Sequence, residues 1–416
     1  MNGLDIMACA MSEAVTQRRM SRALILSNLL TEPLFTLYTF LIFILYKHLG
    51  ASPSEIALLT MLKPVVTILS FYWSAGLRGG AATLKGNVLW AGFWMRAPFL
   101  LFPWVHSVWF VIAAAVNYMF FYRAGIPAWL EIIKRNMGRE GSRAFSMSQA
   151  LGYIEGVALA LACGGILDWN PDSWKGLFFV AALVGLLSLA VQSQIVVEES
   201  VKKEERLSWR EQMVRPWLDS WRLIVGRPDF AKFQWGFMVS GFGLMLIQPA
   251  IPVFCVDVLG VSYLEMAGAV SIAKGLGFAL SSPLWARQIE RMSVFRLAGL
   301  VFLSIGLFTV LLSCSVWGTG WLYGAYFLYG IGQGGSHLVW NMSGPIFSGQ
   351  EESSRYSGVN VVLAGLRGAV APPLGGWLTV VYGPVWILLM GAALCFYSGL
   401  KICGGFFVKD SLSIKQ

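Results

Sequence analysis

The feature that most constrains this chain is a succession of apolar runs, each long enough to cross a lipid bilayer, separated by short polar segments. A transmembrane helix needs about 20 predominantly apolar residues. Of the 416 residues, 56% are hydrophobic and 13% are charged, against about 25% charged in an ordinary soluble domain. Such a chain cannot cover a soluble core with polar surface, so we expect an all-α integral membrane protein.

A hydropathy window of about 19 residues predicts about twelve transmembrane helices. They lie near 22–46, 54–75, 87–104, 107–130, 143–167, 175–196, 231–256, 262–284, 294–315, 319–341, 355–381 and 384–407. The segment 198–229 carries too many charges to cross a membrane and is expected to be a cytoplasmic linker with amphipathic helical character. It separates an N-terminal six-helix bundle, 1–197, from a C-terminal six-helix bundle, 230–416.

An internal repeat relates the two bundles. At a constant offset of 210 residues, Leu49, Gly50, Ser52, Glu55 and Ala57 recur as Leu259, Gly260, Ser262, Glu265 and Ala267. At an offset of 212, Ser142, Arg143 and Gly156 recur as Ser354, Arg355 and Gly368. Shared spacing of this kind indicates a duplicated architecture. We therefore expect two pseudo-symmetric bundles.

The distribution of basic residues predicts the orientation in the membrane. One set of loops holds only Lys47 and Lys175, whereas most of the 31 Lys and Arg residues lie in the loops, linker and termini of the other side. Positively charged loops remain cytoplasmic during insertion. We expect both termini to be cytoplasmic, and the compact chain with very short loops favours a bacterial inner membrane.

The chain resembles the major facilitator superfamily over nearly its whole length. The resemblance rests on the six-plus-six plan with a charged linker, on the turn Leu49-Gly50-Ala51-Ser52, and on the stretch Arg143-Ala144-Phe145-Ser146-Met147-Ser148-Gln149-Ala150-Leu151-Gly152. The loop after helix two departs from the family pattern, because it keeps Gly76, Arg78 and Gly79 without an acidic residue, and its repeat keeps only Arg287 and Arg291. The resemblance implies a monomeric secondary transporter that works by alternating access around a midplane site.

Charged residues inside the predicted spans are the first candidates for function. Each costs roughly 2.5 to 3.5 kcal/mol to insert, so such residues persist where they pair or line a polar cavity. Six lie near the midplane, namely Glu32, Lys63, Arg96, Glu155, Lys274 and Arg367, and Arg123 lies nearer the cytoplasmic end of helix four. Cations outnumber acids in this set, which favours an anionic substrate.

The repeat and the resemblance together suggest a substrate site. Glu155 and Arg367 occupy equivalent positions, as do Ser148 and Asn360 two helical turns earlier. The family arrangement places helix five against helix eight and helix eleven against helix two, which implies Glu155 beside Lys274 and Arg367 beside Lys63. An anionic substrate group would relieve the repulsion between two cations. Permanent ion pairs are the structural alternative, and a structural role is favoured for Arg96 because the family places helix three outside the central lining.

Two stripes of residues add candidates for proton coupling and substrate contact. Helix one carries Asn28, Thr31, Glu32, Phe35, Tyr38 and Thr39 at three- and four-residue spacing, and helix ten carries Tyr326, Gly330, Gln333 and His337 on one face. A carboxyl group in a low dielectric can exchange a proton near neutral pH. We predict that Glu32 couples transport to protons, with His337 as a second relay candidate; an ion pair of Glu32 with Arg123 or Lys63 is the alternative. Tyr38, Tyr326, Gln333 and Asn360 are predicted substrate contacts.

Several functional classes lack a signature in the sequence. The formal charge of +9 comes from Lys and Arg between apolar spans, which does not form the soluble basic face of a nucleic-acid-binding protein. Phosphate-binding GxxxxGK and zinc-binding HExxH motifs are absent, and the six cysteines are scattered. We expect neither an enzyme nor a cofactor or metal, although an integral-membrane enzyme is an alternative that a cytosolic catalytic constellation would reveal.

The sequence thus predicts a proton-coupled carrier of a small organic anion, with membrane lipid around it. A lipid or lysolipid flippase is one alternative, since phospholipid headgroups are anionic too. Efflux of cationic drugs or metabolites is another, which ordinarily requires unpaired acids in the cavity. A receptor that senses its ligand without carrying it is a third.

Overall fold

The computed structural model describes residues 3–75, 81–136, 138–195, 197, 209–289, 291–349 and 353–403. The regular structure of this part of the chain is helical, without a strand. Each predicted span falls on one helix or on a run of consecutive helical segments, which confirms the all-α class. By contact, the chain divides into two compact units: Met1–Leu41 with Leu69–Arg206, and Ile42–Ile68 with Leu207–Gln416.

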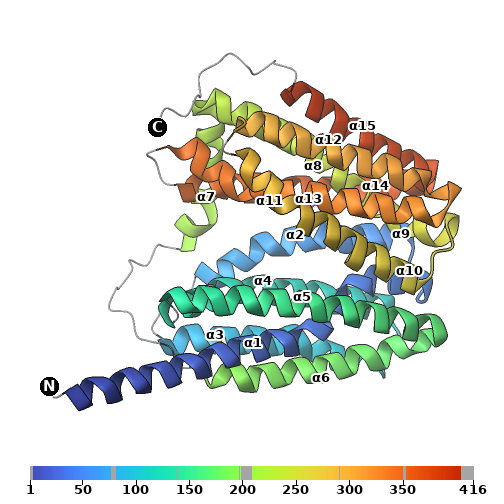
Figure 1. The fold of residues 1–416 in the computed structure, drawn as a ribbon. Helices are drawn as coiled ribbons and strands as arrows, with labels where there is room; N and C mark the ends of the chain where they lie inside the picture. The colour runs from blue at the N-terminus through green and yellow to red at the C-terminus, as the bar shows by residue number, and fades with distance from the viewer. Residues whose placement is uncertain are drawn as a thin grey trace. The chain divides into compact units, whose positions relative to one another are not determined.

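The first unit is built from helices at the N-terminal end of the chain (Figure 1). It holds most of α1 (Gly3–Lys47), the end of α2 (Pro53–Ala75), α3 (Ala81–Arg96), the 3₁₀ segment η1 (Ala97–Leu101), α4 (Val108–Asn136), α5 (Gly138–Trp169), the 3₁₀ segment η2 (Pro171–Ser173) and α6 (Trp174–Ser193). Helix α3 packs against α4 and α6. At its C-terminal end, Phe99 stacks on Phe178 with ring centroids 5.4 Å apart. Aromatic packing therefore closes this end of the unit.

The second unit contains the remaining helices, several of them broken into segments (Figure 1). They are α7 (Trp209–Gly226), α8 (Pro228–Leu246), α9 (Ala250–Val253), η3 (Phe254–Val258), α10 (Tyr263–Ala267), η4 (Gly268–Ala273), α11 (Lys274–Ile289), α12 (Val294–Ser313), η5 (Cys314–Trp317), α13 (Thr319–Ser348), α14 (Ser353–Tyr382) and α15 (Pro384–Cys403). The segments η3 and η4 are π-helical. Such segments are rare and occur frequently at functional sites.

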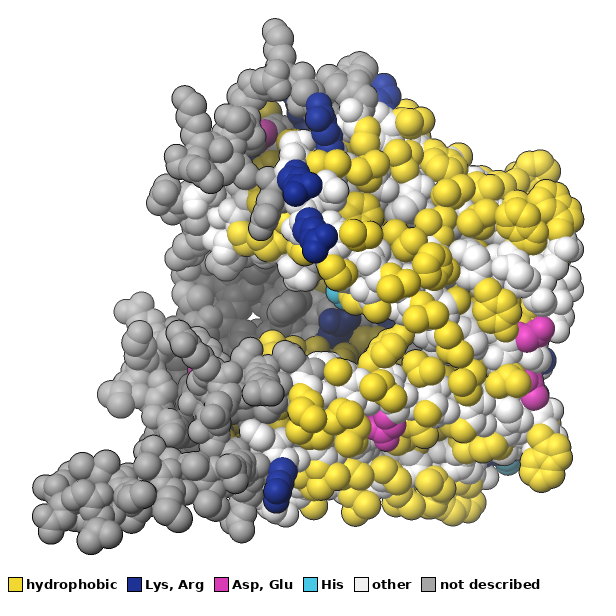
Figure 2. All heavy atoms as spheres, viewed as in Figure 1, with side chains coloured by type: hydrophobic (Ala, Val, Ile, Leu, Met, Phe, Trp, Pro, Cys, Tyr) yellow, Lys and Arg dark blue, Asp and Glu magenta, His cyan; other side chains and the backbone are white. Residues whose placement is uncertain are grey.

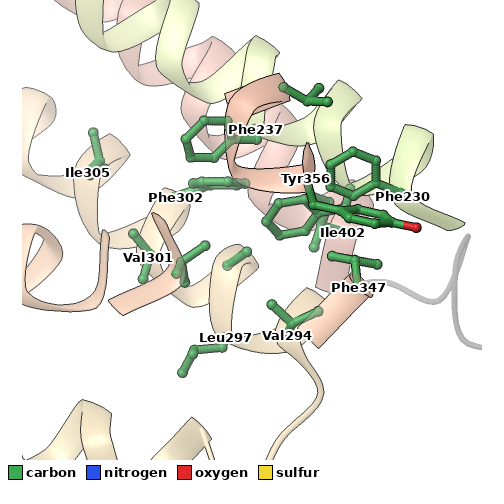
Figure 3. Packing of buried hydrophobic residues seen from close by; sticks show 14 of the residues in the cluster. Phe230, Phe237, Val294, Leu297, Val301, Phe302, Ile305, Phe347, Tyr356 and Ile402 are labelled. Carbon is green, nitrogen blue, oxygen red and sulfur yellow. The ribbon is translucent and has the colours of Figure 1, made fainter. Parts of the chain in front are cut away.

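An aromatic cluster forms the core of the second unit between α8, α12, α13, α14 and α15 (Figure 3). Phe230 lies 5.1 Å from Tyr356 between ring centroids, and both side chains are fully buried. Phe237, from the same helix as Phe230, packs against Phe302 of α12. Rings of this size bury a large apolar area each, so the cluster fixes how the five helices pack.

The two repeated turns have the same local structure. Gly50 and Gly260 both have φ +64°, a left-handed conformation that glycine adopts without strain. The following helices, α2 and α10, begin with the same reciprocal cap, in which the serine side chain accepts from the glutamate backbone and the glutamate carboxylate accepts from the serine backbone. The pairs are Ser52 with Glu55 and Ser262 with Glu265. The repeat inferred from these residues is therefore also a repeat of backbone geometry.

The segment Ile42–Ile68 groups by contact with the second unit, although the predicted N-terminal bundle, 1–197, includes it. Three glycines of α14 explain this grouping. A Cβ atom at Gly368 would lie 2.3 Å from Cγ of Pro64. A Cβ atom at Gly365 would likewise overlap with the side chain of Ile68, and one at Gly376 with that of Ala57. Because these glycines carry no side chain, α2 and α14 approach closely.

Polar contacts also join the segment Ile42–Ile68 to the second unit. They run from the end of α1 to the residues around the start of α10. The hydroxyl of Tyr46 donates to Asp257. The ammonium of Lys47 donates to the carbonyl oxygen of Val261 at 3.2 Å and lies 4.8 Å from the ring centroid of Tyr263. The turn after α1 is thus held within the second unit.

The linker helix α7 differs in composition from its neighbours. Its residues are on average more polar than those of the neighbouring helices. Ser220 and Leu223 are nevertheless buried, and Leu223 belongs to the core cluster of the second unit. The amphipathic helix predicted within 198–229 is therefore present over Trp209–Gly226. Residues 198–208 lie outside the described part.

The surface of the described helices is that of a membrane protein. Hydrophobic side chains cover most of the described face in Figure 2, and few charged ones interrupt them. Within the described residues, ten helical stretches are long and apolar enough to cross a membrane. Two further predicted spans correspond to α3 with η1 and to α13. The chain is therefore an integral, multi-pass membrane protein with about twelve spans.

Candidate functional site

In the first unit, the structure brings Glu32 of α1 and Glu155 of α5 together, close enough for their carboxyl groups to interact electrostatically. Glu32 accepts a hydrogen bond from the hydroxyl of Thr36 at 3.4 Å. A Cβ atom at Gly156 would lie 2.6 Å from Oε1 of Glu32, so this glycine makes room for the carboxyl group. Oε2 of Glu155 is buried without a described hydrogen-bond partner.

The alternative ion pair of Glu32 with Arg123 does not form in the described structure. Arg123 is exposed, and its guanidinium lies 6.0 Å from the ring centroid of Tyr122. The predicted partnership of Glu155 with Lys274 joins the two units and stays a prediction.

The predicted stripe on α1 contacts several neighbouring helices. The Asn28 amide donates to the carbonyl oxygen of Ser148 on α5 at 2.9 Å. The Thr31 hydroxyl lies 3.3 Å from that of Ser188 on α6. The Tyr38 hydroxyl donates to the carbonyl oxygen of Ala115 on α4 at 3.2 Å, and the Tyr38 ring stacks on Tyr118. The stripe therefore packs α1 within the bundle as well as presenting polar groups.

Arg96 lies at the C-terminal end of α3 and is buried among neutral partners. Its Nη1 donates to the carbonyl oxygen of Gly92 at 2.7 Å, and its Nη2 donates to the hydroxyls of Thr31 and Ser188 at 3.0 and 3.1 Å. Sequence reasoning favoured a structural role for this residue and missed Ser188. The available signal was a pair of polar residues one turn apart on α6, Ser188 and Gln192.

A cavity of about 350 Å³ adjoins Arg96 inside the first unit. Six of its lining residues carry polar side chains, and three carry aromatic ones. The polar set is Ser27, Asn28, Thr31, Ser148, Gln149 and Gln192, and the aromatic set is Phe121, Tyr122 and Trp129. The arrangement can surround a small solute with both kinds of group.

In the second unit, Lys274 begins α11 directly after the π-helical segment η4. Its ammonium lies 6.0 Å from the ring centroid of Tyr329 and interacts electrostatically with His337. The backbones of α11 and α13 approach closely here. Gly330 permits this approach, since a Cβ atom at its position would collide with the carbonyl oxygen of Lys274. Lys274 and His337, predicted separately, are thus neighbours.

The other predicted residues on α13 have different surroundings. Tyr326 is buried, and its ring packs 5.8 Å from that of Phe308 on α12. Gln333 is partly buried, and His337 is exposed, with its ring 5.6 Å from that of Phe278. Tyr326 therefore belongs to the packing of α13 against α12, whereas His337 is accessible.

Asn360 of α14 forms a buried hydrogen-bond network in the second unit. Its Oδ1 accepts from Gln234 of α8 at 2.5 Å, and its Nδ2 donates to the hydroxyl of Ser343 of α13 at 2.8 Å. The side chain is buried. The network links three helices.

Arg367 of α14 turns toward α8. Its Nη1 donates to the carbonyl oxygen of Phe237 at 2.7 Å, and its guanidinium lies 4.5 Å from the Phe237 ring centroid. A Cβ atom at Gly241 would lie 1.9 Å from Nη1. Lys63 lies partly buried on α2, whose Pro64 packs against α14 as the family arrangement implied. The helices are adjacent as expected, and the anion shared by Lys63 and Arg367 stays a prediction.

Metal ligands do not cluster in the described residues, where three or more His, Cys, Asp or Glu side chains never meet. The five described cysteines are free thiols. The motif residues Gly76, Arg78 and Gly79 lie outside the described residues.

Known proteins share this fold. A family model described as Major Facilitator Superfamily matches residues 24–372. A mutant of the nucleoside transporter NupG is similar with a TM-score of 0.73 at 14% identity, over 93% of this chain and 100% of that chain. A POT family transporter in complex with 5-aminolevulinic acid is similar with a TM-score of 0.69 at 13% identity, over 92% and 95%. The chain matches no curated protein in sequence. At such identities, the structural likeness concerns the fold.

Proposed function

The chain belongs to the major facilitator superfamily of secondary transporters, and from this premise we propose that it carries a small organic anion by proton-coupled alternating access. The observation that carries the proposal is the charge inside the helices. Lys274 and Arg367 form no ion pair with a described acidic residue; their described contacts include a carbonyl oxygen and aromatic rings. Buried cations with neutral neighbours favour an anionic ligand.

The carboxyl pair of the first unit supports proton coupling. Glu32 and Glu155 lie close together, and neither forms an ion pair with a described cation. Two carboxylates at short range in a low dielectric repel, so such a pair readily holds one proton between them. A proton that binds and leaves in each cycle would drive the anion with it. Glu32 is the residue that we propose to exchange it.

The substrate class can be tested with purified protein. Ligands that bind the native state raise its melting temperature by mass action. We expect small carboxylates or phosphates to stabilise the protein in a thermal-shift screen that also contains lysolipids and cationic drugs. Stabilisation by lysolipids alone would favour a flippase, and stabilisation by cations alone would favour drug efflux; either result would refute the organic-anion proposal.

The coupling residue can be tested by transport in proteoliposomes, using an anion found in the screen. We expect Glu32→Gln to abolish uptake driven by a pH gradient while sparing counterflow, because exchange of bound substrate does not require release of the proton. Asp172→Asn is a matched control, since Asp172 is exposed and pairs with Lys175 at the surface. Loss of both activities in Glu32→Gln would instead assign the residue to substrate binding or folding.

We also propose that both termini are cytoplasmic in a bacterial inner membrane. The low number of basic residues in one set of loops supports this orientation. Reporter fusions at each terminus and within the linker should all report the cytoplasm. A terminus on the other side would mean that the number of spans is odd.

A further inference from the structure

The cavity adjoining Arg96 is lined by residues of the first unit. Its lining comes from α1, α3, α4, α5 and α6, all within Met1–Leu41 and Leu69–Arg206. Its volume of about 350 Å³ falls at the lower end of the range of about 300–1,000 Å³ for ligand pockets. Leu130 and Gln149 line it and are exposed, so its mouth lies between α4 and α5.

Among the described lining residues of this cavity, Arg96 alone carries a charge. It has five N–H donors, and its described hydrogen bonds go to one carbonyl oxygen and two hydroxyls. Its Nε is buried without a described partner. The positive charge is therefore held in place and remains without a counter-ion in the described structure.

The hydroxyl partners are oriented to hold this cation. The Thr31 hydroxyl donates to the carbonyl oxygen of Ser27 at 2.8 Å, and the Ser188 hydroxyl donates to that of Gly185 at 2.6 Å. Because each proton is used within its own helix, each hydroxyl oxygen presents lone pairs to Arg96. This arrangement fixes the direction of the guanidinium without neutralising it, as a preorganised anion site requires.

The remaining lining determines the shape of the ligand. Phe121, Tyr122 and Trp129 of α4 form an apolar, aromatic wall, whereas Ser27 and Gln192 supply polar groups. Flat rings pack well against aromatic side chains. A carboxylate at Arg96 and a planar apolar body along α4 would satisfy both parts of the lining.

We propose that this cavity is a binding site for a small aromatic carboxylate, with Arg96 as the partner of the carboxylate group. None of the lining residues is among the proposed substrate contacts Lys63, Lys274 and Arg367, and the proposal concerns binding alone, whether or not the ligand is transported.

The test uses the purified full chain and benzoate as the probe, with benzamide as a neutral analogue of the same shape. Benzoate should bind measurably, and benzamide should bind at least about tenfold more weakly, as expected for loss of a hydrogen bond to a charged group. Arg96→Gln should weaken benzoate binding by about tenfold or more. Equal binding of benzoate and benzamide would overturn the proposal.

A second variant keeps the test valid if Arg96→Gln fails to fold. Gly125 lines the cavity, and a Cβ atom there would lie 3.5 Å from that of Ala91, an ordinary contact. The Cβ atom therefore fits, and Gly125→Val should fill part of the cavity and abolish benzoate binding, with a melting curve to check that the variant is folded. Gly165→Val is the matched control, because Gly165 of α5 has nothing within 4 Å of its Cβ position. Benzoate binding that survives Gly125→Val, or that is lost in Arg367→Gln instead, would place the site elsewhere.

Discussion

Buried polar side chains surround a cavity in the first unit, whereas in the second unit they are packed against one another. Arg96, which has no acidic partner among the described residues and donates to Thr31 and Ser188, lines together with Thr31 a space of about 350 Å³. Around Asn360, the partners Gln234 and Ser343 come from two other helices and use both ends of the amide. The same kinds of residue thus leave room for a solute in one unit and join helices in the other.

The two buried arginines show the same difference. A neighbouring glycine makes room for each guanidinium: Gly185 of α6 for Arg96 and Gly241 of α8 for Arg367. Arg96 adjoins the cavity, whereas Arg367 lies over the ring of Phe237, which belongs to the aromatic core cluster. The space next to the guanidinium decides what the charge can bind.

The largest effect is expected from the buried network of the second unit. Asn360→Leu removes the acceptor of the Gln234 amide and a donor to the Ser343 hydroxyl, and a buried amide left without its partner is costly. We expect a loss of about 3 kcal/mol in the free energy of unfolding, measured by equilibrium unfolding in mixed detergent micelles.

The matched variant in the first unit is Ser27→Ala. It removes the acceptor of the Gln192 amide, which lines the cavity and can turn to water there. Its expected cost is below about 1 kcal/mol. Equal losses in Asn360→Leu and Ser27→Ala would show that the first unit is as tightly packed as the second.

A smaller effect is expected from the glycines beside the two arginines. In Gly241→Ala, the new Cβ atom would lie 2.1 Å from Cζ of Arg367, and overpacking of this kind costs about 1–3 kcal/mol. In Gly185→Ala, the Cβ atom would lie 2.6 Å from Nε of Arg96, a smaller overlap than the 1.9 Å from Nη1 of Arg367 in Gly241→Ala. We expect about 2 kcal/mol for Gly241→Ala and below about 1 kcal/mol for Gly185→Ala.

Melting curves of the two alanine variants measure this difference. The double variant Gly241→Ala with Arg367→Met should recover most of the lost stability, because a methionine fills the space flexibly and removes a buried charge. Failure of the second substitution to restore stability would mean that Gly241 is needed for another helix contact.

The fold could be predicted from the sequence because membrane spans follow from local composition. The turn at Gly50 and its repeat at Gly260 followed from spacing alone, and both adopt the same conformation. The π-helical segments η3 and η4 could not be predicted, because a change of hydrogen-bond register leaves the hydropathy of a span unchanged. The start of α1 at Gly3, well before its apolar run, was not predicted either.

The helix that carries each charged residue could be predicted, but the direction of its side chain could not. Arg367 was placed on a helix next to α2, and its guanidinium instead reaches α8, because the direction depends on the helix rotation and the rotamer. The setting of Arg96 depends on Thr31 and Ser188, which lie 65 and 92 residues away in the chain. Nothing in local spacing shows that these side chains meet.

The smallest effect concerns the part of the repeats that is alike. Ser52→Ala and Ser262→Ala each remove a helix cap that accepts from a glutamate backbone and completes a reciprocal pair. Loss of such a cap costs about 1 kcal/mol, and we expect the same value for both variants because their geometry is the same. Ser54→Ala is the control, since Ser54 is exposed and does not cap α2. Thermal unfolding of the three variants measures the effect. A loss of stability in Ser262→Ala several times that in Ser52→Ala would contradict this expectation. It would show that the two turns share a backbone conformation but differ in how much their caps stabilise the protein.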